Sequence, residues 1–279
     1  TKDELTRMMV GRDVLFDFPP VVKAPGGVRM RLEALSARND KGVEALKEFS
    51  LELHAGEIVG LAGVDGNGQK ELCEVLTGLR PSSGGRILLD DQDISGRDPA
   101  FYIEQHISHI PEDRHTTGLA MNWSLKNNLI LKQLGREPVS RHHLVQKKVA
   151  EEIWDKAHSE YQIKAISGDD LARALSGGNQ QKVILAREIN SDPRVLIANQ
   201  PTRGLDVGAA EYVRTKILEA RNSGTSCLLV SSDMEELLQL SDRIAVIYGG
   251  QLMGILPRGA DTMAIGRLMM GKREQEVGA

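Results

Sequence analysis

Two glycine-containing segments of this sequence have residues that could bind an anion. The first follows the apolar run 57–62 and precedes residues 69–79, whose apolar positions have helical spacing. A loop between a strand and a helix can direct backbone N–H groups at a phosphate, and the start of the helix adds partial positive charge. The candidate contact residues are Gly63, Val64, Asp65, Gly66, Asn67, Gly68, Gln69, Lys70 and Glu71.

The side chains of this first segment do not match those of a loop that supports hydrolysis. The pattern of such a loop is G-x-x-x-x-G-K-S/T, in which the lysine reaches the β- and γ-phosphates and the hydroxyl holds Mg²⁺. Here Gln69 has the place of the lysine, and Lys70 has the place of the hydroxyl. The backbone cradle is therefore expected without its charged partners. Taken alone, the segment could equally be an ordinary glycine-rich turn.

The second segment lies at 175–182, at the start of another run with helical spacing. Ser176 can cap that helix, while Gly177 and Gly178 let an anion approach the free backbone N–H groups. This arrangement suits a γ-phosphate. The candidate contact residues are Ser176, Gly177, Gly178 and Gln180.

The apolar pattern around these segments predicts an α/β fold. Alternating residues at 30–35 and 44–53 predict strands at the start, and the periodicity of 115–190 predicts an insertion of helices. Further on, short apolar runs of buried-strand type alternate with helical stretches. Such alternation predicts a mainly parallel sheet covered by helices. The runs are 195–198, 227–231 and 244–248, and the stretches are 208–221 and 234–240.

Composition excludes several classes of protein. The chain has 41% hydrophobic and 27% charged residues, as folded proteins do, and its net charge of −4 argues against a general nucleic-acid binder. Cys73 and Cys227 lie in separate apolar segments, which predicts reduced core thiols and no metal site. No run approaches the roughly 18 apolar residues of a membrane span, and the start does not resemble a signal peptide. Membrane association is therefore expected only through a partner.

The two ends of the chain carry similar segments. Residues 5–12 (LTRMMVGR) match residues 265–272 (IGRLMMGK) in the order of their basic, apolar and glycine positions. If this segment ends each copy of a repeated domain, residues 1–12 are the tail of a preceding copy. Residues 13–27, rich in proline and glycine, then form a linker, and residues 28–279 form the domain. The alternative is a chance similarity of two short amphipathic pieces.

Together the motifs resemble the ATP-binding cassette (ABC) family over residues 28–271. The order and spacing match as well. The resemblance implies a P-loop NTPase domain with a RecA-like core, an antiparallel β subdomain and a helical subdomain at about 115–175. The resemblance is strongest to the second domain of tandem ATPase subunits that serve simple-sugar and nucleoside importers. Residues 63–71 resemble the Walker A loop, 175–180 the signature, 195–200 the Walker B strand, 204–206 the D-loop, Glu112 the glutamine-loop position and 230–233 the histidine switch.

Several positions depart from the family pattern. Asn199 and Gln200 replace the Walker B aspartate and the glutamate that activates water, and Ser232 replaces the switch histidine. Because an amide is not a base, general-base assistance worth about 10²–10⁴-fold is expected to be lost. The resemblance therefore implies no catalytic residue and no metal ligand in this domain. ATP would be weak or structural here, and Mg²⁺ would bind only at the partner domain's site.

In the family, two domains enclose two ATP molecules, and each ATP meets the Walker motifs of one domain and the signature of the other. The resemblance thus implies that this domain donates its signature to the preceding ABC domain. It also implies permease subunits, indirectly a solute-binding protein, no nucleic acid, and a peripheral position at the cytoplasmic face of the membrane. Two alternatives are a DNA-associated ATPase head, which needs long heptad arms that are absent, and a scaffold that binds no nucleotide. The sequence does not specify the solute.

Overall fold

The structure is a computed structural model, and it describes residues 24–272. The predicted tail 1–12 and most of the predicted linker 13–27 lie outside the described residues. The described residues form two compact units. One, here called the sheet unit, comprises 24–109, 193–200 and 217–272, and the other, the helical unit, comprises 110–192 and 201–216.

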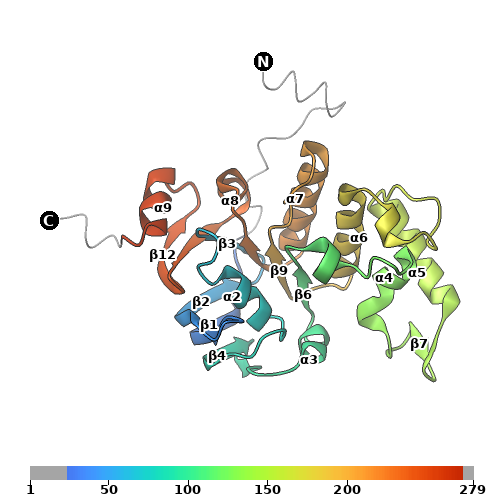
Figure 1. Ribbon diagram of the computed structural model, residues 1–279, viewed down its shortest axis with the longest axis horizontal. Coiled ribbons are helices and arrows are strands. Elements are labelled where there is room, and N and C mark those ends of the chain that lie inside the picture. Colours follow the sequence, from blue (N-terminus) through green and yellow to red (C-terminus); the bar gives the residue numbers. More distant parts are fainter. Residues whose placement is uncertain (1–23, 273–279) are drawn as a thin grey trace, which may run out of the picture. The chain divides into compact units, whose positions relative to one another are not determined.

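A six-stranded sheet forms the centre of the sheet unit, in the order β12-β11-β3-β10-β9-β6 (Figure 1). The neighbours β11, β3, β10 and β9 run parallel, and β12 pairs antiparallel with β11 at one edge. Every residue of β3, β9 and β10 is buried, which is why each reads as a continuous apolar run. The predicted parallel sheet is confirmed. The strands are β3 (Ile58–Ala62), β6 (Ile107–Ile110), β9 (Val195–Asn199), β10 (Ser226–Val230), β11 (Arg243–Tyr248) and β12 (Gln251–Pro257).

An antiparallel sheet of order β2-β1-β4-β5 completes the strands of this unit. Its strands are β1 (Val28–Arg38), β2 (Glu44–His54), β4 (Gly84–Leu89) and β5 (Gln92–Asp93). Buried and exposed residues alternate along β2, so that Phe49, Leu51 and Leu53 join a core cluster that also contains Val59 and Leu61 of β3. β1 and β2 confirm the strands that were predicted at 30–35 and 44–53.

The helices of the sheet unit are short. They are α2 (Gln69–Val75), α3 (Pro99–Glu104), α8 (Met234–Leu240) and α9 (Thr262–Met269), and α7 (Val207–Asn222) contributes residues to both units. α2 ends before the predicted residue 79, because Thr77 Oγ1 bonds to the Cys73 carbonyl and Gly78 turns the chain with φ of 72°. Cys73 and Cys227 are unpaired and buried, and burial raises the pKa of Cys73 to about 12.

The helical unit contains α4 (Leu125–Ile130), α5 (Lys147–Glu160) and α6 (Gly177–Ile189). Shorter elements join them: a π-helical turn η1 (Arg114–Gly118), the 3-10 turns η2 (Leu131–Gln133) and η3 (Ala172–Ala174), and a small hairpin of β7 (Ser140–Arg141) and β8 (Leu144–Val145). The helical periodicity did not predict this hairpin.

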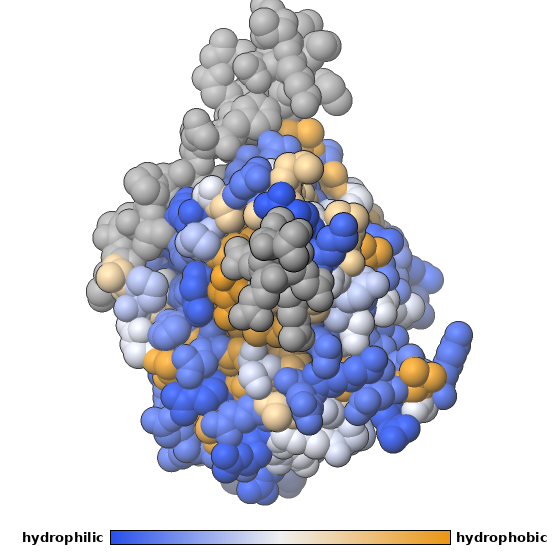
Figure 2. All heavy atoms as spheres, turned by 90° about the vertical axis from the view of Figure 1, so that its left-hand side faces the viewer, coloured by the Kyte–Doolittle hydropathy of each residue, from blue (hydrophilic) through white to orange (hydrophobic). Residues whose placement is uncertain are grey.

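Hydrophilic residues make up most of the surface visible in Figure 2, with smaller hydrophobic areas among them. None of the helices between residues 24 and 272 has the length and hydropathy needed to cross a bilayer.

A buried ion cluster fixes α6 to the rest of the helical unit. Glu188 of α6 is fully buried, and its carboxylate lies 2.5 Å from Lys132 Nζ of η2 and 2.8 Å from Arg187 Nε. Burial opposes the ionisation of Glu188, but the attraction of Lys132 and Arg187 outweighs it and lowers the pKa to about 2. The charged carboxylate therefore stabilises the fold above the pKa of about 4.5 that the unfolded chain would have.

Since the folded pKa of Glu188 is the lower one, its contribution is lost as the pH falls from about 4.5 towards 2. We expect the wild-type free energy of unfolding to fall by about 2 kcal/mol more than that of Glu188→Gln when the pH is lowered from 6 to 3. Urea unfolding of both proteins at several pH values measures the difference. Parallel curves for the two proteins would contradict this assignment.

Candidate functional site

The candidate site residues fall into two groups. Residues 63–71 belong to the sheet unit, and Ser176, Gly177, Gly178 and Gln180 belong to the helical unit. Each group is described here within its own unit. The structure brings the glycine-rich loop (residues 63–68) together with the end of β10, because Val64, Asp65 and Ser232 line the same cavity.

The glycine-rich loop connects the last residue of β3 to the first turn of α2. Gln69, at the lysine position, does not extend out of the loop but lies inside it, with only 8% of its surface exposed. Its Nε2 donates to the Val64 carbonyl at 3.0 Å, and its Oε1 accepts the Asn67 N–H at 3.0 Å. Gly68 has φ of 105°, and a Cβ there would lie 2.5 Å from the Ala45 carbonyl of β2. Only glycine therefore fits at position 68.

Asn67 holds the loop to the turn between β11 and β12. Its Nδ2 donates to the Val64 carbonyl at 2.7 Å, and its Oδ1 accepts the Gly249 N–H at 2.7 Å. The Asn67 carbonyl accepts the Gly250 N–H as well. Sequence reasoning did not predict this role, since the partner glycines are far away along the chain.

Lys70, at the hydroxyl position, points away from the glycine-rich loop. Its Nζ lies 3.5 Å from Asp40 and 3.7 Å from Glu74, and the side chain is 58% exposed. Asp40 also pairs with Arg80, whose hydrogen bond and charge, aided by Lys70, lower the pKa of Asp40. Arg38, at the end of β1, donates to the Gly42 carbonyl of its own hairpin. Neither cation is directed at the loop.

Gln200 and Ser232, which the resemblance places at the catalytic glutamate and the switch histidine, form a hydrogen-bonded pair. Gln200 has φ of 50°, and its N–H donates to the Val230 carbonyl at 2.8 Å. Its Oε1 accepts from both the N–H and the hydroxyl of Ser232, at 3.1 Å each. Asn199 precedes it as the buried last residue of β9. Throughout residues 24–272, no three His, Cys, Asp or Glu side chains converge as metal ligands.

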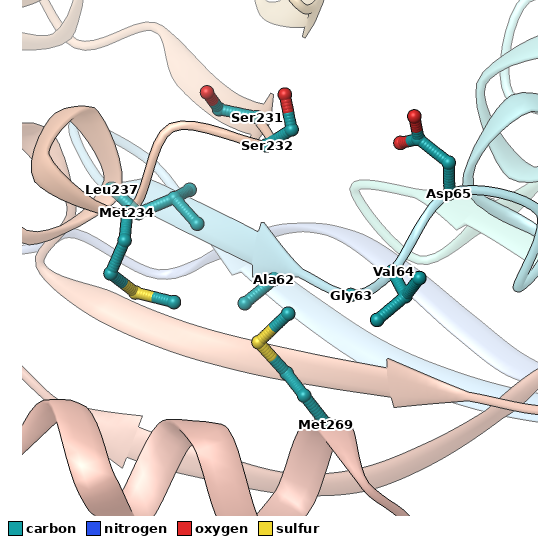
Figure 3. A pocket seen from close by; sticks show the side chains of 9 residues that line it. All are labelled: Ala62, Gly63, Val64, Asp65, Ser231, Ser232, Met234, Leu237 and Met269. Atoms are coloured by element: carbon teal, nitrogen blue, oxygen red, sulfur yellow. The ribbon is translucent and has the colours of Figure 1, made fainter.

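The cavity beside this pair measures about 280 Å³. Figure 3 shows the Asp65 carboxylate and the Ser232 hydroxyl on one side and the sulfur atoms of Met234 and Met269 on the other. Its lining contains a carboxylate and no cation. Because like charges repel, such a lining does not favour a phosphate group.

In the helical unit, the signature turn (residues 175–180) presents an open helix start. Ser176 precedes α6 in extended conformation, but its side chain does not cap the helix as predicted. Instead Ser176 Oγ accepts from Asn179 Nδ2 at 3.0 Å, which leaves the hydroxyl hydrogen for another acceptor. The N–H groups of Gly177 and Gly178 are in the first turn and have no acceptor within the helix.

Gln180 is buried within the helical unit, with 4% of its surface exposed. Its Nε2 donates to the carbonyls of Ala172 and Leu175, and its Oε1 lies 3.1 Å from His115 Nε2 of η1. Gln180 therefore positions the signature turn and does not reach its open side.

Arg114 and Arg203, near the signature turn, were not among the predicted site residues. Arg203 pairs with Glu112, and Arg114 Nη1 donates to the Arg203 carbonyl at 2.7 Å. The other Arg114 nitrogen, Nη2, lies 3.6 Å from where a Cβ of Gly177 would be. Partial burial lowers the pKa of Arg114, and Asp113 opposes this shift. The run of charged residues at 112–115 was the sequence feature that could have identified this site. Glu112, Arg114 and Arg203 line a cavity of about 410 Å³ together with Asp113, His115 and Gly204.

Two import ATP-binding proteins are similar in sequence to this chain over nearly its whole length. A guanosine import ATP-binding protein, NupO of Bacillus subtilis (strain 168), is 42% identical over 281 residues, which cover 99% of this chain and 54% of that protein. A glucose import ATP-binding protein, TsgD13 of Haloferax volcanii, is 42% identical over 280 residues, which cover 97% of this chain and 50% of that protein. The chain thus spans about half the length of the curated relatives it matches.

The fold agrees with that of a solved ATP-binding cassette. The crystal structure of a nucleotide-free ATP-binding cassette from an ABC transporter superposes with a TM-score of 0.72 at 20% identity, covering 91% of this chain and 100% of that one. The predicted P-loop ABC fold, with antiparallel sheet and helical parts, is therefore confirmed. The family model described as ABC transporter matches residues 46–203. The chain belongs to the ABC transporter ATPase family.

Proposed function

We propose that this chain is the non-catalytic ABC domain of an importer's ATP-binding subunit, of the nucleoside or simple-sugar type. The observation that carries the proposal is a contrast between its two half-sites. The signature turn leaves a serine hydroxyl and first-turn N–H groups open. At the domain's own site, by contrast, Gln69 and Gln200 are hydrogen-bonded within the domain.

Charge supports the same division of roles. A site that hydrolyses ATP needs a cation at the phosphates, a metal ligand and a base. Here Lys70 is engaged with Asp40 and Glu74, and the two positions after the β9 apolar run are amides. We therefore infer that ATP at this site is weak or structural, and that Mg²⁺ and hydrolysis belong to the partner domain's site.

We propose that the partner is a preceding ABC domain of the same polypeptide, with residues 1–12 as its tail, 13–27 as linker and 28–279 as the present domain. The chain's share of its relatives' length supports this proposal. So does the motif that residues 5–12 have in common with 265–272. In the second copy, Gly271 has φ of 82°, and a Cβ there would lie 2.7 Å from the Tyr248 ring. Packing against Tyr248 thus requires a glycine at this position of the motif.

The remaining partners follow from the importer role. Permease subunits would carry the solute across the membrane, and a solute-binding protein would deliver it to them. The subunit would then lie peripherally on the cytoplasmic face of the membrane. The functions for which the relatives are named, guanosine and glucose import, support this class of system.

This chain alone should show negligible ATPase activity. Neither a general base nor a metal ligand is present at positions 199, 200 and 232, so the rate should be at least about 10²-fold below that of an intact cassette. Phosphate release from the purified chain, with and without Mg²⁺, measures it. Robust Mg²⁺-dependent turnover would refute the non-catalytic assignment.

The signature turn should matter to the partner's ATP. In the full-length protein assembled with its permease, Gly177→Asp places a carboxylate where a γ-phosphate would approach. We expect ATPase activity to fall by at least about tenfold, because two like charges lose water on closure. The nearest atom to the new Cβ is 3.6 Å away, so the fold accommodates the change.

The matched control for Gly177→Asp is Gly266→Asp. It introduces the same change in α9, where a Cβ at position 266 meets nothing within 4 Å. Its ATPase activity should stay near wild type. Normal activity with Gly177→Asp, or equal losses in both variants, would mean that this domain does not donate its signature.

A further inference from the structure

The Gln69 side chain occupies the glycine-rich loop in the way a ligand would. It is nearly buried, and its carboxamide bonds the loop at two points, the Val64 carbonyl and the Asn67 N–H, both at 3.0 Å. One amide group thus serves as donor to the first half of the loop and as acceptor for the second half.

The loop is shaped to hold this carboxamide. A Cβ at Gly63 would lie 2.7 Å from Gln69 Nε2 and 2.7 Å from Ile247 Cγ2, so that any larger residue at position 63 would displace Gln69. Asn67 adds a second bond to the Val64 carbonyl and fixes the loop to Gly249. The Val64 carbonyl, the Asn67 N–H and the Gln69 carboxamide are therefore already bonded to one another.

A nucleotide phosphate would need the same backbone group. Loops of this type bind phosphate through N–H groups that point inward, and here the Asn67 N–H points at Gln69 Oε1. A phosphate oxygen can take that N–H only if the Gln69 side chain leaves. The phosphate would then gain no lysine, since Lys70 lies beside Asp40 and Glu74.

We propose that Gln69 is an intramolecular competitor of nucleotide phosphates, and that it determines how weakly this loop binds them. The inference deepens the proposed function, because it gives the weak ATP site of the non-catalytic domain a specific cause. Of the two bonds that Gln69 makes to the loop, the one from the Asn67 N–H is the bond that a phosphate oxygen would take over.

Binding of tripolyphosphate and of ATP to this chain, measured by calorimetry, tests the proposal. Tripolyphosphate reports on the loop without a contribution from the base. Gln69→Ala should bind tripolyphosphate at least about tenfold more tightly than wild type. The reason is that the variant lacks the two hydrogen bonds of the Gln69 carboxamide, which wild type must break to bind phosphate. Gln69→Lys should bind more tightly still, since it adds a cation.

The control Gln92→Ala removes the same side chain from the exposed strand β5 and should leave the affinity at the wild-type value. Wild type that binds as tightly as Gln69→Ala would overturn the proposal. So would a folded Gln69→Ala that binds no more tightly than wild type.

Amide hydrogen exchange without any ligand gives an independent readout. In Gln69→Ala the Asn67 amide should exchange at least about tenfold faster, whereas the Gly249 amide, bonded to Asn67 Oδ1, should keep its rate. An Asn67 amide that stays equally protected would overturn the proposal. Neither experiment involves the signature turn. If the Gln69 proposal fails, the Gly177→Asp experiment still tests the proposed function independently.

Discussion

Backbone N–H and C=O groups that are shielded from water need hydrogen-bond partners, and this requirement applies to the partly buried segment between β3 and α2. In this chain two carboxamides meet it. Gln69 and Asn67 both bond the Val64 carbonyl, and Asn67 also bonds the turn after β11. The glycine at 68 lets the segment pass within contact of β2. Neutral side-chain hydrogen bonds therefore connect the two halves of this segment and link it to the turn after β11.

Charged side chains near the glycine-rich loop and near the signature turn form ion pairs within their own unit. Lys70 and Arg80 share Asp40, and in the helical unit Arg203 pairs with Glu112 while Arg114 bonds the Arg203 backbone. A nucleotide in the glycine-rich loop would have to compete with such pairs or do without a cation. The signature turn differs, because its donors are backbone N–H groups and a hydroxyl that need no countercharge. The proposed non-catalytic role rests on this contrast between the glycine-rich loop and the signature turn.

The sequence predicted the elements whose pattern is local. The buried run 57–62 became β3 at Ile58–Ala62, and 234–240 became α8 at Met234–Leu240. Elements without a clear apolar period, such as β4, β5, α3 and the hairpin of β7 and β8, were missed, because turns and edge strands are determined by contacts with distant residues. The functional roles assigned to the substituted site residues come from the family resemblance and stay predictions.

The bonds made by those residues were not predictable in the same way. A glutamine at position 69 could point to solvent or into the loop, and the choice depends on the space that Gly63 leaves beside Ile247. Likewise Ser176 has the side chain of a helix cap, yet it bonds Asn179 instead. Spacing identifies such residues, but the orientation of a short polar side chain is decided by its neighbours in three dimensions.

The buried cluster of Glu188 has a mechanical consequence for the signature turn. α6 begins at that turn, and near its other end Glu188 is held by Lys132, in the turn that follows α4. Near its beginning, Gln180 contacts His115. Side-chain contacts thus link α6 to neighbouring elements of the helical unit near both of its ends. A shift of η1 or of the turn after α4 would therefore act on α6, and through α6 on the signature turn at its start.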